Sequence, residues 1–223
     1  MIPLRDKLRL KHIPVITIAL ILVNIYVFFK EIYLGNGLIL FIDKHALVPA
    51  YFISLNGITL SVVINKIVSL LSSLFIHSGW MHIIGNMWYL WIFGDNVEYR
   101  LGHLRYLFFY LLCGIIGNLV HVTMNLNSTI PVIGASGCIS GVLGAYFMLS
   151  PKAKIVTILP VLIFWIVADV PAFFFLGIWF LIQFLSGYYS LIKTSGAGIA
   201  WWAHVGGFIG GAVLKTFMVK SRR

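Results

Sequence analysis

The stretch "VIGASGCISGVLGAYF", residues 132–147, contains almost nothing polar except Ser136 and Ser140. A run of this composition predicts an apolar helix. Gly134 and Gly137 flank the first serine, and glycine permits unusual backbone angles and the close approach of other groups. The stretch therefore predicts a buried helix that begins with one uncovered hydroxyl group.

The composition of the whole chain is that of a membrane protein. Of its 223 residues, 61% are hydrophobic and 10% are charged, whereas soluble domains carry about 25% charged residues. The six acidic residues are too few to cover a globule of this size in water. We therefore expect an all-α, polytopic membrane protein that is surrounded by the lipid bilayer.

The net charge of +10 does not indicate nucleic-acid binding, because the basic residues form short clusters between apolar runs. Clusters of this kind mark cytoplasmic loops. If the chain crosses the membrane six times with both termini in the cytoplasm, twelve of the 16 Lys and Arg residues lie on the cytoplasmic side. The clusters are Arg5, Lys7, Arg9 and Lys11; Arg100 and Arg105; Lys152 and Lys154; and Lys215, Lys220, Arg222 and Arg223.

Six apolar segments predict transmembrane spans, although two of them fall short of the usual length of roughly 20 residues. They are residues 13–29, 80–94, 104–124, 135–150, 172–191 and 199–219. The segment 155–168 has only about 14 residues and contains Pro160, so we expect it to be interfacial or re-entrant. The predicted organisation is a basic cytoplasmic tail at residues 1–12, a membrane domain at residues 13–219 and a basic tail at residues 220–223.

The six-span topology places the unusual polar residues at a similar depth. The second, fourth and sixth predicted spans all enter from the non-cytoplasmic side, and each carries its polar residues within about two turns of that entrance. The second span carries His82 and Asn86, the fourth carries Ser136 and the sixth carries His204. We therefore expect three helices to direct these side chains into one pocket.

These residue types match the chemistry of acyl transfer. A serine hydroxyl becomes a nucleophile when an adjacent base takes its proton, and His204 is the candidate base for Ser136. Free backbone N–H groups at the start of the helix of Ser136 could stabilise an oxyanion. His82 and Asn86 lie four residues apart on one helical face and could donate further hydrogen bonds, and His77 precedes them.

Each feature also has a structural interpretation. The sequence "GASG" could be a packing face of small residues, and His204 could be an interfacial histidine bonded to a neighbouring helix. The histidines could hold zinc, but their spacing matches no common zinc pattern, so we expect no metal. Among the six acids only Glu31 and Asp43 are placed on the side of His204, which makes a Ser–His dyad without a carboxylate the simplest model.

Four segments occur in an order that is highly specific. They are "HSGWMHIIGNMWYLWIFGDNVE", "LGHLRYLFFYLLCGI", "GASGCISGVLGAY" and "WWAHVGGFIGG". Together they resemble the rhomboid intramembrane serine proteases. The resemblance implies a six-helix core with Ser136 as the nucleophile and His204 as the base. It also implies an oxyanion hole formed by His82, Asn86 and the backbone N–H of Ser136.

The resemblance implies a supporting role for the residues around this centre. His77 matches the first histidine of the family's His-x4-His-x3-Asn pattern, where it is structural. Some rhomboids place an aromatic residue one turn after the nucleophile, beneath the catalytic histidine, whereas this chain has Ser140 there. We therefore expect Trp201, Trp202 or Ser140 to position His204.

Three classes of function remain open at this point. The first is hydrolysis of a peptide bond in or near a transmembrane segment of a single-span or multi-span membrane protein. The second is a catalytically silent rhomboid-like protein that binds membrane-protein clients, although such relatives typically lack the serine or the histidine. The third is a transporter or channel, which would require charged groups in the spans or an inverted repeat. We expect the protease, as a multi-pass protein of the bacterial cytoplasmic membrane without nucleic-acid partner or small-molecule cofactor.

Overall fold

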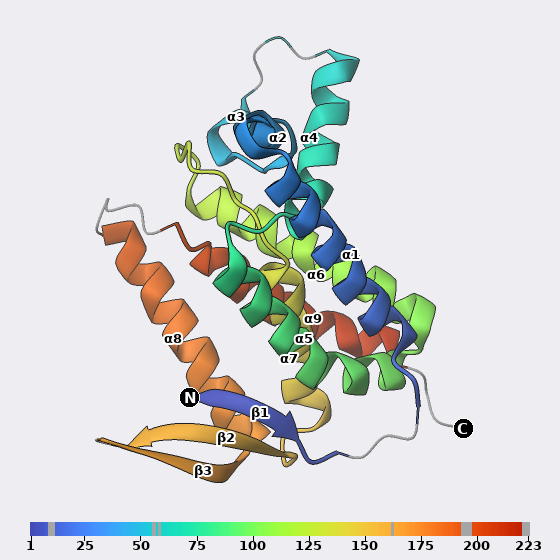
Figure 1. The fold of residues 1–223 in the computed structure, drawn as a ribbon, viewed down its shortest axis with the longest axis vertical. Helices are drawn as coiled ribbons and strands as arrows, with labels where there is room; N and C mark the ends of the chain where they lie inside the picture. Colours follow the sequence, from blue (N-terminus) through green and yellow to red (C-terminus); the bar gives the residue numbers. More distant parts are fainter. Residues whose placement is uncertain (9–11, 55–56, 58, 162, 193–197, 220–223) are drawn as a thin grey trace.

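The computed structural model describes residues 1–8, 12–54, 57, 59–161, 163–192 and 198–219. In this part of the chain, a helical bundle carries a small sheet at one end and short helices at the other (Figure 1). The long helices are α1 (Val15–Tyr33), α5 (Trp80–Leu101), α6 (His103–Met124), α7 (Ser136–Leu149), α8 (Ala172–Ile192) and α9 (Trp201–Met218). The predicted basic tail at residues 220–223 lies outside the described residues.

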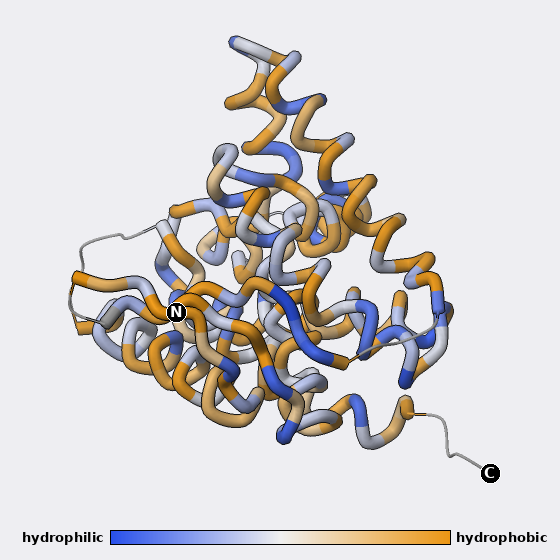
Figure 2. Tube along the Cα trace, turned by 60° about the horizontal axis from the view of Figure 1, so that its bottom comes forward, coloured by the Kyte–Doolittle hydropathy of each residue, from blue (hydrophilic) through white to orange (hydrophobic). Residues whose placement is uncertain are grey.

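A helix lies at each of the six ranges that the sequence predicts as spans, and hydrophobic residues run along most of the helices (Figure 2). Among the described residues, α1, α6 and α8 are long and apolar enough to cross a membrane. A fourth span results if residues 60–75 and 80–101, which are bent by 81°, are counted together. The mostly helical membrane architecture is therefore confirmed, while the number of crossings and the side of the termini stay predictions.

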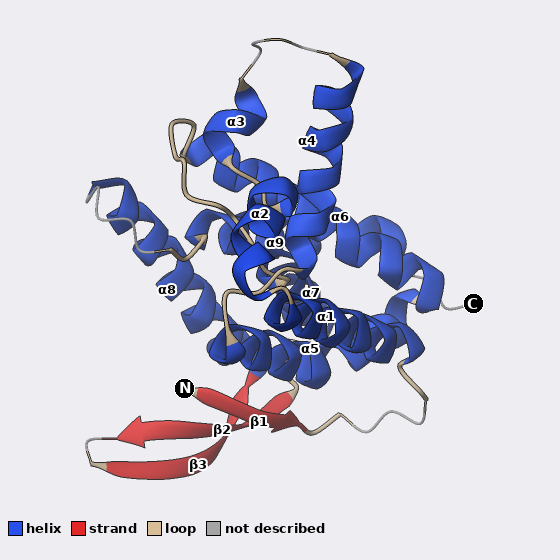
Figure 3. Cartoon of the chain, turned by 45° about the horizontal axis from the view of Figure 1, so that its top comes forward, coloured by secondary structure: helices blue, strands red, loops and turns tan. Residues whose placement is uncertain are grey.

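The prediction of an all-α fold is wrong at one end of the molecule. There β1 (Ile2–Asp6), β2 (Lys154–Val161) and β3 (Phe164–Pro171) form an antiparallel sheet in the order β1-β2-β3 (Figure 3). The segment 155–168 is thus a β-hairpin, and the predicted tail at residues 1–12 supplies a strand. The hairpin is rich in Ile, Val, Phe and Trp, which favour strands, whereas the prediction rested on the length of the segment, on Pro160 and on the distribution of charge.

The sheet is attached to the bundle through β1. The carboxylate of Asp6 accepts hydrogen bonds from Asn96 Nδ2 at 2.6 Å and from the Tyr146 hydroxyl at 2.8 Å. The indole of Trp88 donates to the carbonyl oxygen of Pro3 at 2.7 Å. These contacts hold β1 against α5 and α7, and β1 in turn supplies the edge on which the hairpin pairs.

The long first loop forms the end of the molecule opposite the sheet (Figure 1). It contains α2 (Leu38–His45), α3 (Pro49–Ile53) and α4 (Leu60–Ser72), followed by a short 3-10 turn at Ser73–Phe75. The Thr59 hydroxyl caps α4 by accepting a hydrogen bond from the backbone N–H of Val62. The loop returns the chain to the bundle just before α5, where the predicted site begins.

Helix α7 is central, and glycine lets α9 pack directly on its backbone. A Cβ atom at Gly211 would overlap the carbonyl oxygen of Gly141, and one at Gly144 would overlap the carbonyl oxygen of Phe208. A third such contact joins Gly207 to α7. The main chains of α7 and α9 therefore lie in direct contact, and the glycines of both helices are what permits this close approach.

The first turn of α1 is held by a buried carboxylate of α5. Glu98 is inaccessible to solvent and accepts hydrogen bonds from the backbone N–H groups of Ile16 at 2.9 Å and Thr17 at 2.8 Å. The Thr17 hydroxyl donates to the same carboxylate at 2.7 Å. An anion at the start of a helix satisfies N–H groups that have no partner within the helix and complements the helix dipole.

Replacing Glu98 with glutamine is expected to destabilise the protein by about 2–4 kcal/mol, because an amide NH2 would then face buried N–H donors. The unfolding midpoint in mixed micelles would measure this loss. Asp169→Asn is the matched control, because Asp169 forms an exposed ion pair with Lys7. Equal midpoints for Glu98→Gln and wild type would refute the proposed role of this carboxylate.

Candidate active site

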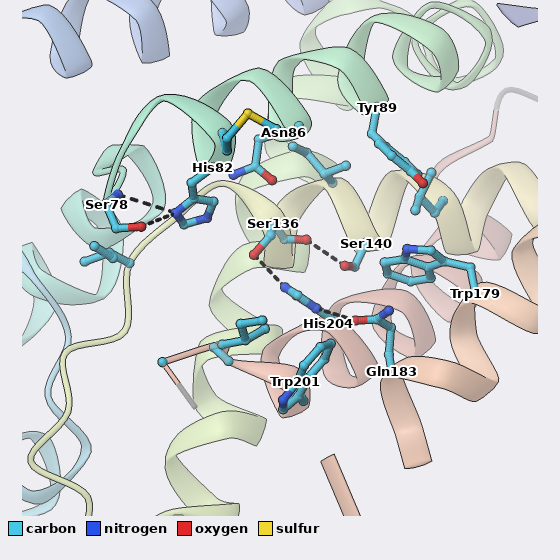
Figure 4. Close-up of a pocket in the computed structure, with 18 residues that line it drawn as sticks. Ser78, His82, Asn86, Tyr89, Ser136, Ser140, Trp179, Gln183, Trp201 and His204 are labelled. Carbon is cyan, nitrogen blue, oxygen red and sulfur yellow. Dashed lines mark hydrogen bonds between the residues drawn. The ribbon is translucent and has the colours of Figure 1, made fainter. Parts of the chain in front are cut away.

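A cavity of about 500 Å³ lies among α5, α7, α8 and the start of α9 (Figure 4). The four predicted catalytic and oxyanion-hole residues line it, namely His82, Asn86, Ser136 and His204, and so does the predicted supporting residue Trp201. Apolar side chains such as Ile139 and Leu143 form the wall on α7 below the serine. The structure therefore brings together residues from three helices that the sequence had placed at one depth.

Ser136 and His204 form a direct hydrogen bond in this cavity. Ser136 is the first residue of α7, and His204 lies in the first turn of α9. The distance between Ser136 Oγ and His204 Nε2 is 2.8 Å. Because α7 and α9 pack through glycine, two helix starts come close enough for this contact. The pair has the separation needed for proton transfer from hydroxyl to imidazole.

The hydrogen bonds of His82 determine which ring nitrogen carries its proton. His82 Nδ1 lies 3.4 Å from the backbone N–H of Ser78, which can only donate. The Ser78 hydroxyl lies 3.0 Å from the same nitrogen. Nδ1 therefore acts as the acceptor, and the neutral ring carries its proton on Nε2. His82 thus presents an N–H donor on the side of the ring that faces away from Ser78.

Gly134 lies directly beside this donor. Its φ of +120° disfavours any residue with a side chain, and a Cβ atom there would be 2.6 Å from His82 Nε2 and 3.7 Å from Asn86 Nδ2. Gly137, in contrast, has ordinary helical geometry, and a Cβ atom there would come no closer than 3.7 Å to its neighbours. Of the two flanking glycines, only Gly134 has the unusual backbone angle that the sequence suggested.

His77 does not face the cavity but holds Asn86. Its Nδ1 lies 3.1 Å from the carbonyl oxygen of Phe75, which can only accept, so Nδ1 carries the proton. His77 Nε2 is then the acceptor for Asn86 Nδ2 at 3.0 Å. The backbone N–H of His77 donates to the buried carboxylate of Glu31 at 3.2 Å. One hydrogen of the Asn86 amide is thereby fixed, and the other is free to point into the cavity.

The residue that hydrogen-bonds the far side of the His204 ring is Gln183 on α8 (Figure 4). Its Oε1 lies 2.8 Å from His204 Nδ1, and its side chain is buried. This residue was not predicted from the sequence. The available signal was that Gln183 is the one carboxamide in an otherwise largely apolar segment, "AFFFLGIWFLIQFLSGYYSLI".

The aromatic and hydroxyl groups proposed to position His204 have different roles. The Trp201 ring meets the His204 ring edge-on at 6.1 Å, and the Trp179 ring lies at the same centroid distance. Trp202 is instead directed at α8, where it packs against Gly187 and Phe184. The Ser140 hydroxyl donates to the carbonyl oxygen of Ser136 at 2.6 Å. Of the three predicted residues, the structure thus places Trp201 against the His204 ring.

Metal-binding residues do not gather in the part of the chain that the structure describes. No group of three His, Cys, Asp or Glu side chains there is arranged to hold a metal ion. The rings of His77 and His82 are 5.0 Å apart, and their hydrogen bonds go to Phe75, Asn86 and Ser78. The histidines of this region are therefore held by protein groups.

The fold and the cavity define a class: a helical membrane protein with a serine and a histidine paired between two helix starts. The Rhomboid domain model matches residues 65–221, which include all the residues of the cavity. The chain therefore belongs to the rhomboid family, and the resemblance noted from the sequence is confirmed.

Individual relatives are similar over shorter stretches. Rhomboid protein 1, mitochondrial, of Saccharomyces cerevisiae is 35% identical over 92 residues, which cover 40% of this chain and 27% of that protein. YdcA of Bacillus subtilis is 32% identical over 97 residues, covering 43% of this chain and 48% of YdcA. Presenilin-associated rhomboid-like protein A, mitochondrial, of Danio rerio is 36% identical over 95 residues, covering 41% of this chain and 25% of that protein. The matched part is less than half of each of these relatives.

Proposed function

We propose that this chain is a serine endopeptidase that hydrolyses peptide bonds in or near the transmembrane segments of other membrane proteins. The observation that carries the proposal is the 2.8 Å hydrogen bond between Ser136 Oγ and His204 Nε2 in the wall of the cavity. A neutral imidazole at this distance can take the hydroxyl proton and activate the serine. Membership of the rhomboid family supports the same reaction.

The proposed reaction has two steps, acylation of Ser136 and hydrolysis of the resulting ester. In the first step, Ser136 Oγ attacks the carbonyl carbon of the substrate while His204 Nε2 takes the hydroxyl proton. The C–N bond of the tetrahedral intermediate then breaks, His204 gives the proton to the leaving amine, and the acyl group remains as an ester on Ser136. Water attacks this ester with His204 again as the base. The step releases a carboxylic acid and restores the serine hydroxyl.

The negative charge on the carbonyl oxygen would be stabilised by donors around Gly134. His82 Nε2–H, the second hydrogen of Asn86 Nδ2 and the backbone N–H of Ser136 are the proposed donors. The absence of a side chain at Gly134 leaves space for the oxygen beside His82 Nε2. The bond from His77 to Asn86 supports this role because it holds the amide nitrogen on the side of the cavity.

Removal of one donor provides a graded test of this oxyanion hole. His82→Ala and Asn86→Ala are each expected to lower kcat by about 100- to 1,000-fold with little change in KM, because the charge develops only in the transition state. Steady-state cleavage of a fluorogenic transmembrane peptide in micelles measures both constants. A rise in KM at unchanged kcat in both variants would show that these residues bind substrate instead.

The proposed substrate is a membrane protein, with one span or several. A helical segment engages its carbonyl groups in hydrogen bonds within the helix, so it must unwind locally before Ser136 can attack. Residues that weaken a helix, such as Gly and Pro, should therefore favour cleavage when they lie near the scissile bond. The polar groups of the cavity would admit the water that the second step requires.

The proposed topology has six crossings with both termini in the cytoplasm of a bacterial cell. The pairing of β1 with β2 supports it, because paired strands lie on one side of a membrane. The chain between them must then cross an even number of times, as α1, α5, α6 and α7 together would do. Ser136 lies at the end of α7 away from the sheet. The 14 residues of α7 span about 21 Å along the helix axis, so the proposed topology places Ser136 near the outer surface of the membrane.

The proposal is tested by reconstituting the protein in liposomes with a single-span reporter and with a fluorophosphonate probe. We expect the reporter to be cut, and mass spectrometry to find the phosphonate on Ser136 alone among the serines. A folded protein that neither cuts a panel of reporters nor reacts with the probe would overturn the proposal. Retained binding of the intact reporters would then favour the client-binding function.

A further inference from the structure

A buried amide on α8 completes a row of three hydrogen-bonded side chains. Gln183 Oε1 lies 2.8 Å from His204 Nδ1, and His204 Nε2 lies 2.8 Å from Ser136 Oγ. Figure 4 shows the imidazole between the serine and the glutamine. Only 7% of Gln183 is exposed, although it lies in a helix apolar enough to cross a membrane. A polar group in this setting is costly unless it has a specific partner.

The hydrogen bond from His204 Nδ1 to Gln183 Oε1 determines which tautomer the imidazole adopts. A neutral ring carries one proton, on Nδ1 or on Nε2. Only the ring with its proton on Nδ1 can accept the hydroxyl proton of Ser136 at Nε2. An amide oxygen accepts and cannot donate, so Gln183 Oε1 stabilises this tautomer and leaves the other one without an acceptor for its N–H.

Among the residues that the structure describes, Gln183 supplies the acceptor for the proton on His204 Nδ1. The rings of Trp179 and Trp201 pack near the imidazole, but an indole N–H is a donor and cannot accept from Nδ1. Ser140 is engaged with the carbonyl oxygen of Ser136. The acid nearest in the chain to α8, Asp169, lies in β3 at the other end of the bundle. The Nδ1 proton thus depends on an amide from α8.

We propose that Gln183 is a positioning residue for the Ser136–His204 pair, which selects the productive histidine tautomer and fixes the plane of the ring. The proposal rests on the proposed protease function. It adds an uncharged third member to what the sequence indicated was a dyad. A neutral acceptor performs this task without placing a carboxylate in the membrane, where an unpaired charge would be expensive.

The test compares Gln183→Met, which keeps the length of the side chain and removes the acceptor, with Gln183→Glu, which restores an acceptor. Ile182→Met is the matched control on the same helix, because 52% of Ile182 is exposed. Cleavage of a fluorogenic transmembrane peptide gives kcat and KM as functions of pH, and the unfolding midpoint is measured for every variant.

We expect Gln183→Met to lower kcat by about 10- to 100-fold, with KM and the unfolding midpoint close to those of wild type. Gln183→Glu should recover most of kcat, and a charged acceptor should move the acidic limb of the kcat profile to higher pH. Ile182→Met should match wild type throughout. A structural tie between α8 and α9 would instead lower the unfolding midpoint of Gln183→Met together with kcat, and it would leave the acidic limb of the Gln183→Glu profile where it is in wild type.

Two results would overturn the positioning role. One is a kcat of Gln183→Met equal to that of wild type. The other is a loss of kcat that follows a lower unfolding midpoint and is not restored by glutamate. If Gln183→Met does not fold, an unchanged pH profile for Gln183→Glu would equally overturn the role. Failure of the protease function is a separate result, because the wild-type protein would then show no cleavage at any pH.

Discussion

Ser136→Ala and His204→Ala are each expected to lower the rate of reporter cleavage by about 10⁴-fold or more, to below detection. Alanine at position 136 removes the proposed nucleophile. Alanine at position 204 leaves the hydroxyl without the proposed base, which lies 2.8 Å from it in the native structure. The double variant should be no slower than either single variant, because the two residues act as one unit. Cleavage in liposomes, followed over hours by gel, covers the necessary range.

The controls for this prediction must separate loss of chemistry from loss of fold. Ser190→Ala and His45→Ala change the same residue types outside the cavity and should cleave at the wild-type rate. Ser136→Ala should keep the wild-type unfolding midpoint, since it removes one hydroxyl from a site lined by other polar groups. Substantial cleavage by folded Ser136→Ala would mean that another group attacks the substrate.

Gly211→Ala is expected to reduce the free energy of unfolding by about 3 kcal/mol or more. The added Cβ atom would overlap the carbonyl oxygen of Gly141, which is main chain and cannot rotate away as a side chain can. The helices α7 and α9 would have to separate along their contact. Because they carry Ser136 and His204, cleavage should fall together with stability. The unfolding midpoint in mixed micelles and the cleavage rate measure the two effects.

Gly177→Ala on α8 is the matched control for the packing of α7 on α9. A Cβ atom there would lie 3.9 Å from Phe147, which is an ordinary contact. Alanine favours a helix over glycine by about 0.5–1 kcal/mol, so this variant should be as stable as wild type or more so. If both glycine variants had the wild-type midpoint, α7 and α9 would not be packed as closely as the structure has them.

The proximity of Ser136 and His204 could be predicted from the sequence, because each residue stands near the start of an apolar helix that was expected to enter the membrane from the same side. Ser136 and His204 each stand near the start of an apolar segment, and a regular rise per residue converts that position into a depth. The unusual backbone of Gly134 followed from its residue type. The proton positions on His77 and His82 did not, because they depend on carbonyl and amide groups of Phe75 and Ser78 that only the folded loop supplies.

Two features required the structure because they arise from contacts between distant segments. Gln183 reaches His204 only because of how α8 is rotated against α9, and hydropathy does not report rotation. The strand at Ile2–Asp6 pairs with Lys154–Val161, and the sequence of neither segment predicts which segment it pairs with. Its length and charge predicted that the second of these segments does not cross the membrane, which stays a prediction, whereas its β-branched and aromatic residues favour the strand that the structure shows.

The pairing of β1 with β2 also has a consequence for the order in which the molecule is assembled. The ribosome makes residues 2–6 well before residues 154–161, and α1, α5, α6 and α7 are made in between. The partner strand β2 follows these helices in the chain, so β1 should stay without a strand partner while the helices insert. Trp88 and Asn96 of α5 can bond Pro3 and Asp6 before α7 is made, whereas Asp6 finds Tyr146 only once α7 has joined α5. The strand pairing of a segment synthesised early is therefore among the last contacts to form, and protection of its amides from hydrogen exchange would mark the completion of biogenesis.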